Sequence, residues 1–413
     1  MQYGLIGAKL GHSYSPAIHA ELGDYDYRLY EQTEAEFTDL LRRRDFRGLN
    51  VTIPYKKVAY RLCDALSDTA RAVGSVNTLV VRPDGSLFGH NTDIGGFIAM
   101  LRHAGIGAAG RKAVILGSGG TSLTAQAALK RLGAREVVVV SRQGPVDYDA
   151  LYRDHADAEL LVNTTPVGMY PNNGRAAVDI ARLPDLRGVA DVIYNPDKTA
   201  LILDAEARGI PCAGGLYMLV DQAREAAETF TGRAIPESET DRIHALLRGE
   251  ALNLVLVGMP GSGKSTVGAA LARAMDRPLV DCDAEIVRRA GKSIPEIFAQ
   301  DGEATFRELE ARTIAEVCRE KHQVIAMGGG AVLREDNVRA MRQNGKVLLL
   351  LRDLDALPMD GRPLSKSPEA LRAMWQAREG RYRAAADVAL DNNGPLAETV
   401  RAAKEAFYEA AHH

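Results

Sequence analysis

The sequence Leu254-Val255-Leu256-Val257-Gly258-Met259-Pro260-Gly261-Ser262-Gly263-Lys264-Ser265-Thr266 joins a short apolar run to a glycine-rich turn. Its spacing is G-x-x-x-x-G-K-[ST], in which backbone N–H groups surround the phosphates of a nucleotide and the hydroxyl binds Mg²⁺. Because the helix after such a turn directs its positive end at the same anion, the pattern predicts strand, loop and helix in that order. We therefore expect an α/β domain that binds a nucleotide and Mg²⁺. The residues expected at the nucleotide are Gly261, Ser262, Gly263, Lys264, Ser265 and Thr266.

The composition is that of an ordinary soluble protein. With 413 residues, the chain can form several domains of roughly 100–200 residues each. A net charge of −3 gives no electrostatic reason to expect nucleic acid or an anionic membrane as a partner, so we expect small-molecule substrates. The four cysteines form no C-x-x-C pair, the start lacks a basic signal-peptide region, and no apolar run approaches the roughly 20 residues of a membrane span. We therefore expect a cytoplasmic protein. The sequence does not choose between a monomer and a homodimer.

Apolar strand-like runs alternate with helical segments almost throughout, which predicts α/β layers. A helix rich in Ala and Glu is expected from about Met218 to Phe230, and turn-forming residues at 231–236 then interrupt the pattern. A second series of strands and helices begins at Leu252. We therefore place the main domain boundary between Gly232 and Leu252.

Two carboxylates follow the phosphate-binding loop. We expect a strand over 279–283 that places Asp281 and Asp283 on one face, because successive strand side chains alternate. Asp281, together with Ser265, is expected to hold Mg²⁺, and Asp283 to accept the proton of a substrate hydroxyl. Three glycines at 328–330 follow another apolar run, where the backbone can approach a ligand closely.

These motifs, in this order with Phe306-Arg307-Glu308-Leu309-Glu310 and Arg362-Pro363-Leu364, resemble shikimate kinase from Leu252 to the end of the chain. The resemblance implies an NMP-kinase-like domain with a parallel sheet that phosphorylates shikimate. It implies that Asp283 is the base, that Lys264 is catalytic, and that Arg362 contacts ATP from a lid that closes over the transferring phosphoryl group. The residues implied at shikimate are Asp283, Arg307, Gly329, Gly330 and Arg378.

The kinase half departs from the family pattern at two places. The segment 352–361 is shorter than the usual lid, with no counterpart of a second lid arginine. The family's Arg-x-Pro-Leu-Tyr is replaced by Arg378-Glu379-Gly380-Arg381-Tyr382. Another small polyol is the alternative substrate for this class of kinase.

The first half contains a second nucleotide signature. An apolar run at 114–116 enters a glycine turn, and a helix and a second strand over 137–140 complete a βαβ unit. The second strand ends in Ser141-Arg142 where an NAD enzyme usually has an acidic residue, and an arginine suits the 2′-phosphate of NADP. We therefore expect NADP(H) as cofactor. The residues expected at it are Gly117, Ser118, Gly119, Gly120, Thr121, Ser141, Arg142, Thr164 and Gly215.

Polar motifs around this unit resemble shikimate dehydrogenase from Met1 to about Gly232. They include Gly11-His12-Ser13-Tyr14-Ser15-Pro16, Asn50-Val51-Thr52-Ile53-Pro54-Tyr55-Lys56, Gly74-Ser75-Val76-Asn77-Thr78, Asn91-Thr92-Asp93 and Tyr217-Met218-Leu219-Val220-Asp221-Gln222. The resemblance implies a split α/β substrate domain (1–93 plus 214–248), an inserted Rossmann NADP-binding domain (94–213) and then the kinase domain (249–413). The residues it implies at the dehydrogenase substrate are Ser13, Ser15, Thr52, Asn77, Asn91, Tyr217 and Gln222.

The resemblance makes Lys56 and Asp93 the catalytic pair. Hydride delivery to a carbonyl creates an alkoxide, and a cation beside that oxygen lowers the barrier, while Asp93 orients Lys56. The two halves together predict a bifunctional enzyme of aromatic amino acid biosynthesis, which reduces 3-dehydroshikimate and then phosphorylates shikimate. Three alternatives stay open: a metabolite sensor without turnover, a structural Lys56–Asp93 surface pair, and quinate as a dehydrogenase substrate.

Overall fold

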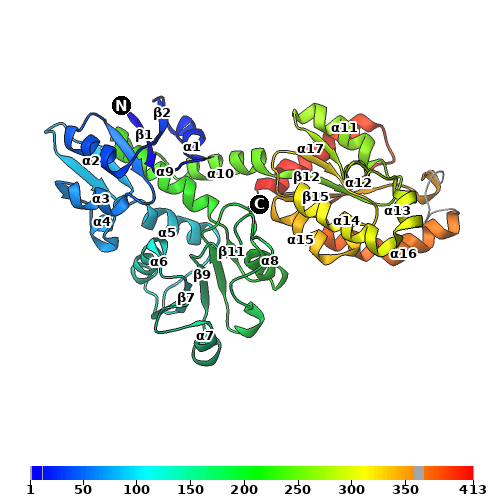
Figure 1. Ribbon diagram of the computed structural model, residues 1–413, viewed down its shortest axis with the longest axis horizontal. Helices are drawn as coiled ribbons and strands as arrows, with labels where there is room; N and C mark the ends of the chain where they lie inside the picture. The colour runs from blue at the N-terminus through cyan, green and yellow to red at the C-terminus, as the bar shows by residue number, and fades with distance from the viewer. Residues whose placement is uncertain (1, 12, 358–366, 413) are drawn as a thin grey trace. The chain divides into compact units, whose positions relative to one another are not determined.

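The fold is described by a computed structural model over residues 2–11, 13–357 and 367–412. The chain divides into two compact units: Met1–Asn195 with Thr199–His244, and Pro196–Lys198 with Ala245–His413. Both are α/β structures, with the first unit running from blue to green and most of the second from green to red in Figure 1. No helix within the described residues is long and apolar enough to cross a membrane.

The first unit begins with a mixed sheet in the order β2-β1-β3-β5-β6-β4. Its strands are β1 (Tyr3–Gly7), β2 (Tyr27–Glu31), β3 (Gly48–Val51), β4 (Ala65–Leu66), β5 (Thr78–Val81) and β6 (Leu87–His90). The helices between them are α1 (Ser15–Leu22), α2 (Glu34–Arg43), α3 (Lys56–Leu62) and α4 (Asp68–Val73). Ile6 and Leu49 pack against Phe37 of α2, whereas Tyr3 and Tyr27 pack against Phe230 of α9 (Leu216–Thr231). The sheet is therefore covered on one face by a helix from much later in the chain.

The second sheet of this unit is parallel, in the order β11-β10-β9-β7-β8. Its strands are β7 (Lys112–Leu116), β8 (Glu136–Val140), β9 (Leu160–Asn163), β10 (Gly188–Asp191) and β11 (Cys212–Ala213). Ala113 and Ile115 enter the core beneath α5 (Asp93–His103) and α6 (Gly120–Arg131), while Val114 and Leu116 enter the core beneath α7 (Tyr148–Asp154) and α8 (Ala200–Ala207). Helices on both faces produce a doubly wound sheet, whose ligands bind beyond the carboxyl ends of the strands.

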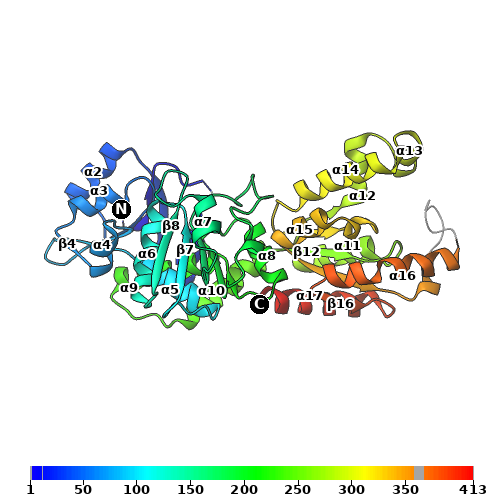
Figure 2. The ribbon, with the colours of Figure 1, turned by 90° about the horizontal axis from the view of Figure 1, so that it is seen from below.

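The second unit is a parallel sheet in the order β13-β14-β12-β15-β16. Its strands are β12 (Asn253–Val257), β13 (Leu279–Asp281), β14 (Val324–Ala326), β15 (Gly345–Leu351) and β16 (Val388–Asp391). Leu254 and Leu256 pack under α11 (Lys264–Met275) and α17 (Leu396–His412). Val255 and Val257 face the core of α14 (Gly302–Val317), α15 (Glu335–Gln343) and α16 (Pro368–Ala385). In Figure 2, α12 (Cys282–Ala290), α13 (Ile294–Gln300) and α14 lie on the opposite side of this unit from α17.

The predicted α/β fold class, with a Rossmann-type sheet in the first half and a parallel P-loop sheet in the second, is confirmed. The strand expected over 279–283 is wrong in its last two residues, because β13 ends at Asp281 and α12 begins at Cys282. Asp281 caps that helix: its Oδ1 accepts hydrogen bonds from the backbone N–H of Asp283 at 3.0 Å and of Ala284 at 3.2 Å. Asp283 therefore lies in the first turn of a helix, not on the strand with Asp281. The two units divide within α10 (Ser238–Ala251), between His244 and Ala245.

Candidate active sites

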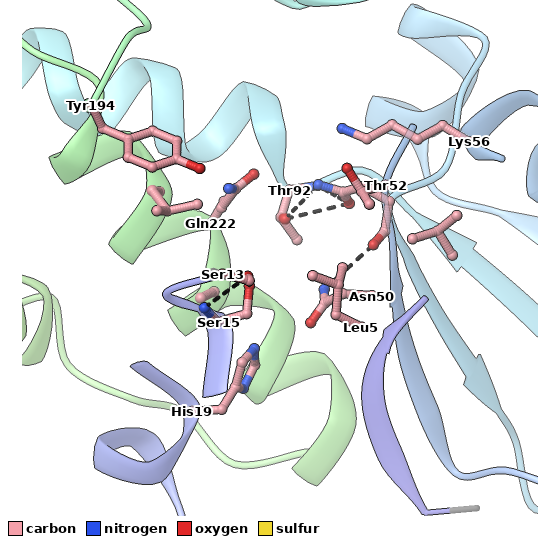
Figure 3. Close-up of a pocket in the computed structure, with 14 residues that line it drawn as sticks. Leu5, Ser13, Ser15, His19, Asn50, Thr52, Lys56, Thr92, Tyr194 and Gln222 are labelled. Atoms are coloured by element: carbon pink, nitrogen blue, oxygen red, sulfur yellow. Dashed lines mark hydrogen bonds between the residues drawn. The ribbon is translucent and has the colours of Figure 1, made fainter. Parts of the chain in front are cut away.

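A cavity of about 140 Å³ lies beside the mixed sheet of the first unit. Side chains from opposite ends of the unit's sequence line it, among them Ser13 and Ser15 near the start and Gln222 on α9. Figure 3 shows Tyr194 and Gln222 on one side of the cavity, with Thr52 and Lys56 on the other. The lining is mostly hydroxyl and amide groups, which suits a small polyhydroxylated molecule.

Lys56 and Asp93 form an ion pair at the edge of this cavity. Lys56 Nζ lies 2.6 Å from Asp93 Oδ2, and the two side chains are only 29% and 11% exposed. Asp93 Oδ1 accepts a hydrogen bond from Asn77 Nδ2 at 2.9 Å, and the Asp93 backbone N–H donates to Asn91 Oδ1 at 3.0 Å. Because both carboxylate oxygens are occupied, Asp93 holds the ammonium group in one place.

A second cavity of about 330 Å³ adjoins the same pair and reaches the start of α6. Lys56 lines both cavities, and Gly120 and Thr121 line this one. No side chain caps the start of α6, and a Cβ on Gly119 or Gly120 would meet no atom within 4 Å. The uncapped start of this helix therefore has room beside it for the phosphates of a dinucleotide.

The second unit has a cavity of about 540 Å³ at its glycine-rich loop. Gly258, Gly261 and Gly263 have φ angles of 147°, 87° and 93°, which side-chain-bearing residues rarely adopt, so the loop curls around the cavity. Lys264 Nζ donates to the carbonyl oxygens of Gly258 and Met259 at 2.9 Å each. The backbone N–H groups of such a loop bind phosphate, and here the Lys264 ammonium group bonds two carbonyl oxygens of the same loop.

Ser265 and Asp281 meet in this cavity, with Ser265 Oγ 2.7 Å from Asp281 Oδ2. A hydroxyl and a carboxylate completed by phosphate oxygens and water are the oxygen ligands that Mg²⁺ prefers. The residues present therefore fit a Mg²⁺ ion bound together with a nucleotide.

The glycine loop at 328–330 brings the other predicted kinase residues together. A Cβ on Gly328 would lie 2.6 Å from Asp283 Oδ1, and one on Gly330 would collide with the Arg307 guanidinium. Arg378 Nη1 donates to the carbonyl oxygen of Gly329 at 3.4 Å. The Asp283 carboxylate and two guanidinium groups, those of Arg307 and Arg378, thus lie beside a segment of three glycines that has no side chains.

Arg307 is held by two carboxylates of its own helix, Glu310 at 2.9 Å and Glu303 at 3.1 Å. Burial raises the pKa of Glu310, although the neighbouring Arg307 opposes the shift. The guanidinium is thereby held against the glycine loop, where a Cβ on Gly330 would collide with it.

Comparison with known proteins identifies both halves. A family model described as the shikimate dehydrogenase substrate binding domain matches residues 5–79, and one described as shikimate kinase matches residues 260–407. A shikimate dehydrogenase (NADP(+)) of Clostridium perfringens (strain SM101 / Type A) is 34% identical over 266 residues, which cover 60% of this chain and 98% of that protein. The chain belongs to the shikimate dehydrogenase family.

Two solved structures resemble the dehydrogenase part. A chorismate mutase/shikimate 5-dehydrogenase fusion protein from Clostridium acetobutylicum is 34% identical with a TM-score of 0.56, covering 60% of this chain and 96% of that one. A quinate dehydrogenase from Corynebacterium glutamicum in complex with NAD is 29% identical with a TM-score of 0.54, covering 59% and 98%. With its kinase domain, this protein is a fusion of an NADP-dependent oxidoreductase and a shikimate kinase. Its cofactors are NADP(H), ATP and Mg²⁺.

The dehydrogenase cavity contains most of the residues predicted at its substrate. Ser13, Ser15, Thr52, Asn77 and Gln222 all line it. Asn91 does not; it is fully buried, where its Oδ1 accepts the Asp93 backbone N–H and its Nδ2 donates to the Ser75 carbonyl at 3.1 Å. Asn91 is therefore a support for Asp93.

Tyr217 is the residue that the structure removes from this set. It does not line the cavity, its ring stacks on His103 with centroids 4.0 Å apart, and its hydroxyl donates to Asp241 Oδ1 at 2.8 Å. On an α-helix, five residues correspond to a rotation of roughly 140°, so Tyr217 and Gln222 of α9 face different directions.

Sequence reasoning missed several lining residues, of which Tyr194 is the most informative. It lies just beyond β10 and lines the cavity beside Gln222 (Figure 3). The signal that could have found it is its place after the carboxyl end of a parallel strand, where ligands of such sheets bind. The other lining residues not predicted are Leu5, His19, Asn50, Val51, Thr92, Leu219 and Ala223.

Several residues predicted at NADP or ATP shape the backbone of the nucleotide sites. Gly117 has a φ of 101° and passes Thr164, whose Oγ1 donates to the Leu116 carbonyl at 2.7 Å. A Cβ on Gly215 would collide with the Val192 carbonyl, which explains a glycine there. Ser262 is fully buried, and its carbonyl accepts a hydrogen bond from Asn392 Nδ2 at 2.7 Å, so it shapes the loop. Arg362, predicted on the lid, lies outside the described residues.

Proposed function

We propose that the dehydrogenase domain reduces 3-dehydroshikimate to shikimate with NADPH, and that the kinase domain then phosphorylates the 3-hydroxyl of shikimate with ATP. The observation that carries the first reaction is Lys56, which lines both the polyol-sized cavity and the cavity at the start of α6. A cation between a substrate site and a cofactor site lies where charge develops during carbonyl reduction.

In the reduction, bound NADPH supplies the hydride. Lys56 stabilises the negative charge that grows on the carbonyl oxygen and transfers a proton to it, while Asp93 keeps the ammonium group oriented. Ser13, Ser15 and Gln222 offer hydroxyl and amide groups to the carboxylate and hydroxyls of the substrate. Within the described lining, Lys56 is the only lysine or arginine, so it is the cation available to the carbonyl oxygen.

In the phosphorylation, Ser265 and Asp281 would hold Mg²⁺, which would offset the negative charge of the ATP phosphates. Asp283 accepts the proton of the shikimate hydroxyl, and Lys264 follows the charge on the transferring group. Arg307 and Arg378, beside the same glycine loop, pair with the shikimate carboxylate through planar donors.

The domain ranges and the compartment belong to this proposal. Each of the ranges 1–93 plus 214–248, 94–213 and 249–413 contains a core of its own in the described residues, which supports this division. A further core joins Val73 and Met218 to α5 and α6, where the first two domains meet. The cytoplasm, as the site of the pathway, is supported by four cysteines that are all free thiols.

Two variants test the partition of activities. Lys56→Ala should abolish NADPH oxidation with 3-dehydroshikimate while ATP-dependent phosphorylation of shikimate persists, and Lys264→Ala should do the reverse. Each variant is the folding control for the other site. If either change removed both activities in a folded protein, the assignment of one reaction to each domain would be wrong.

Quinate is a second candidate substrate because a quinate dehydrogenase is similar to this chain to nearly the same degree as the shikimate enzymes. The kinase domain favours shikimate, since a fused kinase needs that product. The ratio of kcat/KM for shikimate with NADP⁺ to that for quinate with NAD⁺ tests this preference, and a ratio below one would reverse it.

A further inference from the structure

Arg352 has no role in the chemistry described so far, yet it lines the cavity at the glycine-rich loop. Among the described lining residues the charged groups are two cations, Lys264 and Arg352, and two carboxylates, Asp281 and Asp283. Lys264 is matched to the β- and γ-phosphates by its place in the motif. A nucleoside triphosphate carries more negative charge than Lys264 offsets, so a second cation in this cavity can offset part of the remaining charge.

The topology of the sheet accounts for the position of Arg352. It is the first residue after β15, which pairs in parallel with β12, the strand that enters the glycine-rich loop. Neighbouring parallel strands end at the same edge, so the residue after β15 emerges beside the loop. A Cβ on Gly263 would lie 3.8 Å from Arg352 Nη1, which puts the guanidinium against the loop.

Within the ranges 2–11, 13–357 and 367–412, no hydrogen bond or ion pair joins Arg352 to another residue. The nearby carboxylates are engaged elsewhere: Asp353 Oδ1 accepts from Asn393 Nδ2 at 3.2 Å, and Asp355 pairs with Arg372 at 2.9 Å. The side chain is exposed. Among the described residues, the Arg352 donors therefore have no contact that a ligand would have to break.

We propose that Arg352 binds the nucleotide through the α- and β-phosphates, as a bidentate partner to their oxygens. The loop backbone around Gly263 faces these two phosphates in this motif, and the guanidinium lies beside that residue. A planar fork of donors matches phosphate geometry, whereas a lysine is only a point charge. The inference rests on the kinase function proposed above and names an additional residue of its nucleotide site.

The test is the affinity of the full chain for ADP and for adenosine, measured by calorimetry with Mg²⁺ present. Arg352→Ala should weaken ADP binding about tenfold or more and leave adenosine binding unchanged. Arg352→Lys should recover only part of the loss, because the bidentate geometry is absent. The matched control is Arg372→Ala, which removes the same charge from an exposed ion pair outside the cavity and should leave ADP affinity unchanged.

Three outcomes overturn the inference. The first is unchanged ADP affinity in Arg352→Ala while Lys264→Ala weakens it. The second is an equal loss for adenosine and ADP, which would indicate stacking on the base. The third is an equal loss in Arg372→Ala, which would indicate a general charge effect. Absence of ADP binding in the unaltered protein would instead refute the proposed kinase function.

Discussion

Lys56 and Asp93 differ from most charged pairs of this chain in their burial. Their side chains are 29% and 11% exposed, against 69% and 48% for the surface pair Arg153–Asp154. Partial exclusion of water strengthens the attraction between the charges, and removal of one partner leaves the other poorly compensated. The pair is therefore more than a surface contact.

Asp93→Asn should lower kcat for reduction by about 100-fold or more, because the amide keeps the shape but cannot hold Lys56 as an oriented cation. Steady-state NADPH oxidation measures the loss, and kinase activity of the same preparation controls for folding. A kcat within a factor of two of the unaltered enzyme would contradict the role of Asp93.

Tyr194 and Tyr217 form a matched pair of tyrosines, one inside the cavity and one outside it. Tyr194→Phe should raise the Kd for shikimate about tenfold, the cost of one hydrogen bond to a charged or polar group. Tyr217→Phe should leave it unchanged, since that hydroxyl bonds Asp241. Equal effects in fluorescence titrations with shikimate would contradict this division.

At the scale of elements, His19 joins α1, β2 and α9. Its ring stacks on Tyr27 with centroids 3.9 Å apart, and its Nδ1 lies 2.6 Å from the Tyr25 hydroxyl. Burial lowers the pKa of His19 to about 3, so the folded protein keeps the ring neutral. In the unfolded chain the imidazole takes up a proton below about pH 6.5.

This difference predicts a pH dependence of stability. The contribution of neutral His19 is fully present above about pH 6.5 and is lost as the pH falls toward 3, at about 1.4 kcal/mol per pH unit. Asp191 acts in the opposite direction, because burial raises its pKa to about 6. The useful measurement is therefore the difference between variants.

His19→Gln should flatten the slope of unfolding free energy between pH 6 and 5 by about 1 kcal/mol per unit relative to the unaltered protein, as measured by urea unfolding of the dehydrogenase unit. His103→Gln is the control, since that side chain is 45% exposed. If the unfolding free energies of His19→Gln and of the unaltered protein changed with pH by the same slope, His19 would take up its proton equally in the folded and unfolded states, which would contradict the prediction.

At the scale of the whole molecule, each unit has its own cores and its own nucleotide cavity. A ligand stabilises the unit that binds it, by about 2.7 kcal/mol at 100 times its Kd. NADP⁺ should therefore slow hydrogen exchange in β7 and α6 but not in β12 and α11, and Mg²⁺·ADP should do the opposite. Protection of both units by either ligand would show energetic coupling between them.

Local pattern was enough for much of the fold. The phosphate-binding loop, the βαβ unit at 114–140 and the two families could be predicted, because glycine spacing and apolar periodicity act over a few residues. The boundary of β13 could not, because Asp281 can either continue a strand or cap a helix, and its hydrogen bonds to Asp283 and Ala284 select the cap.

The amino-acid sequence by itself determined the class of chemistry: two nucleotide loops, a lysine, and carboxylates and arginines in the order of two known families. Only the tertiary structure decided which side chains share a cavity. Tyr194 lines the substrate cavity and Tyr217 does not, because helix rotation and strand order set the direction of each side chain. Arg352 likewise acquires its place beside Gly263 only through the pairing of β15 with β12. Such contacts depend on how elements pack, and packing joins positions whose separation along the chain carries no local signal.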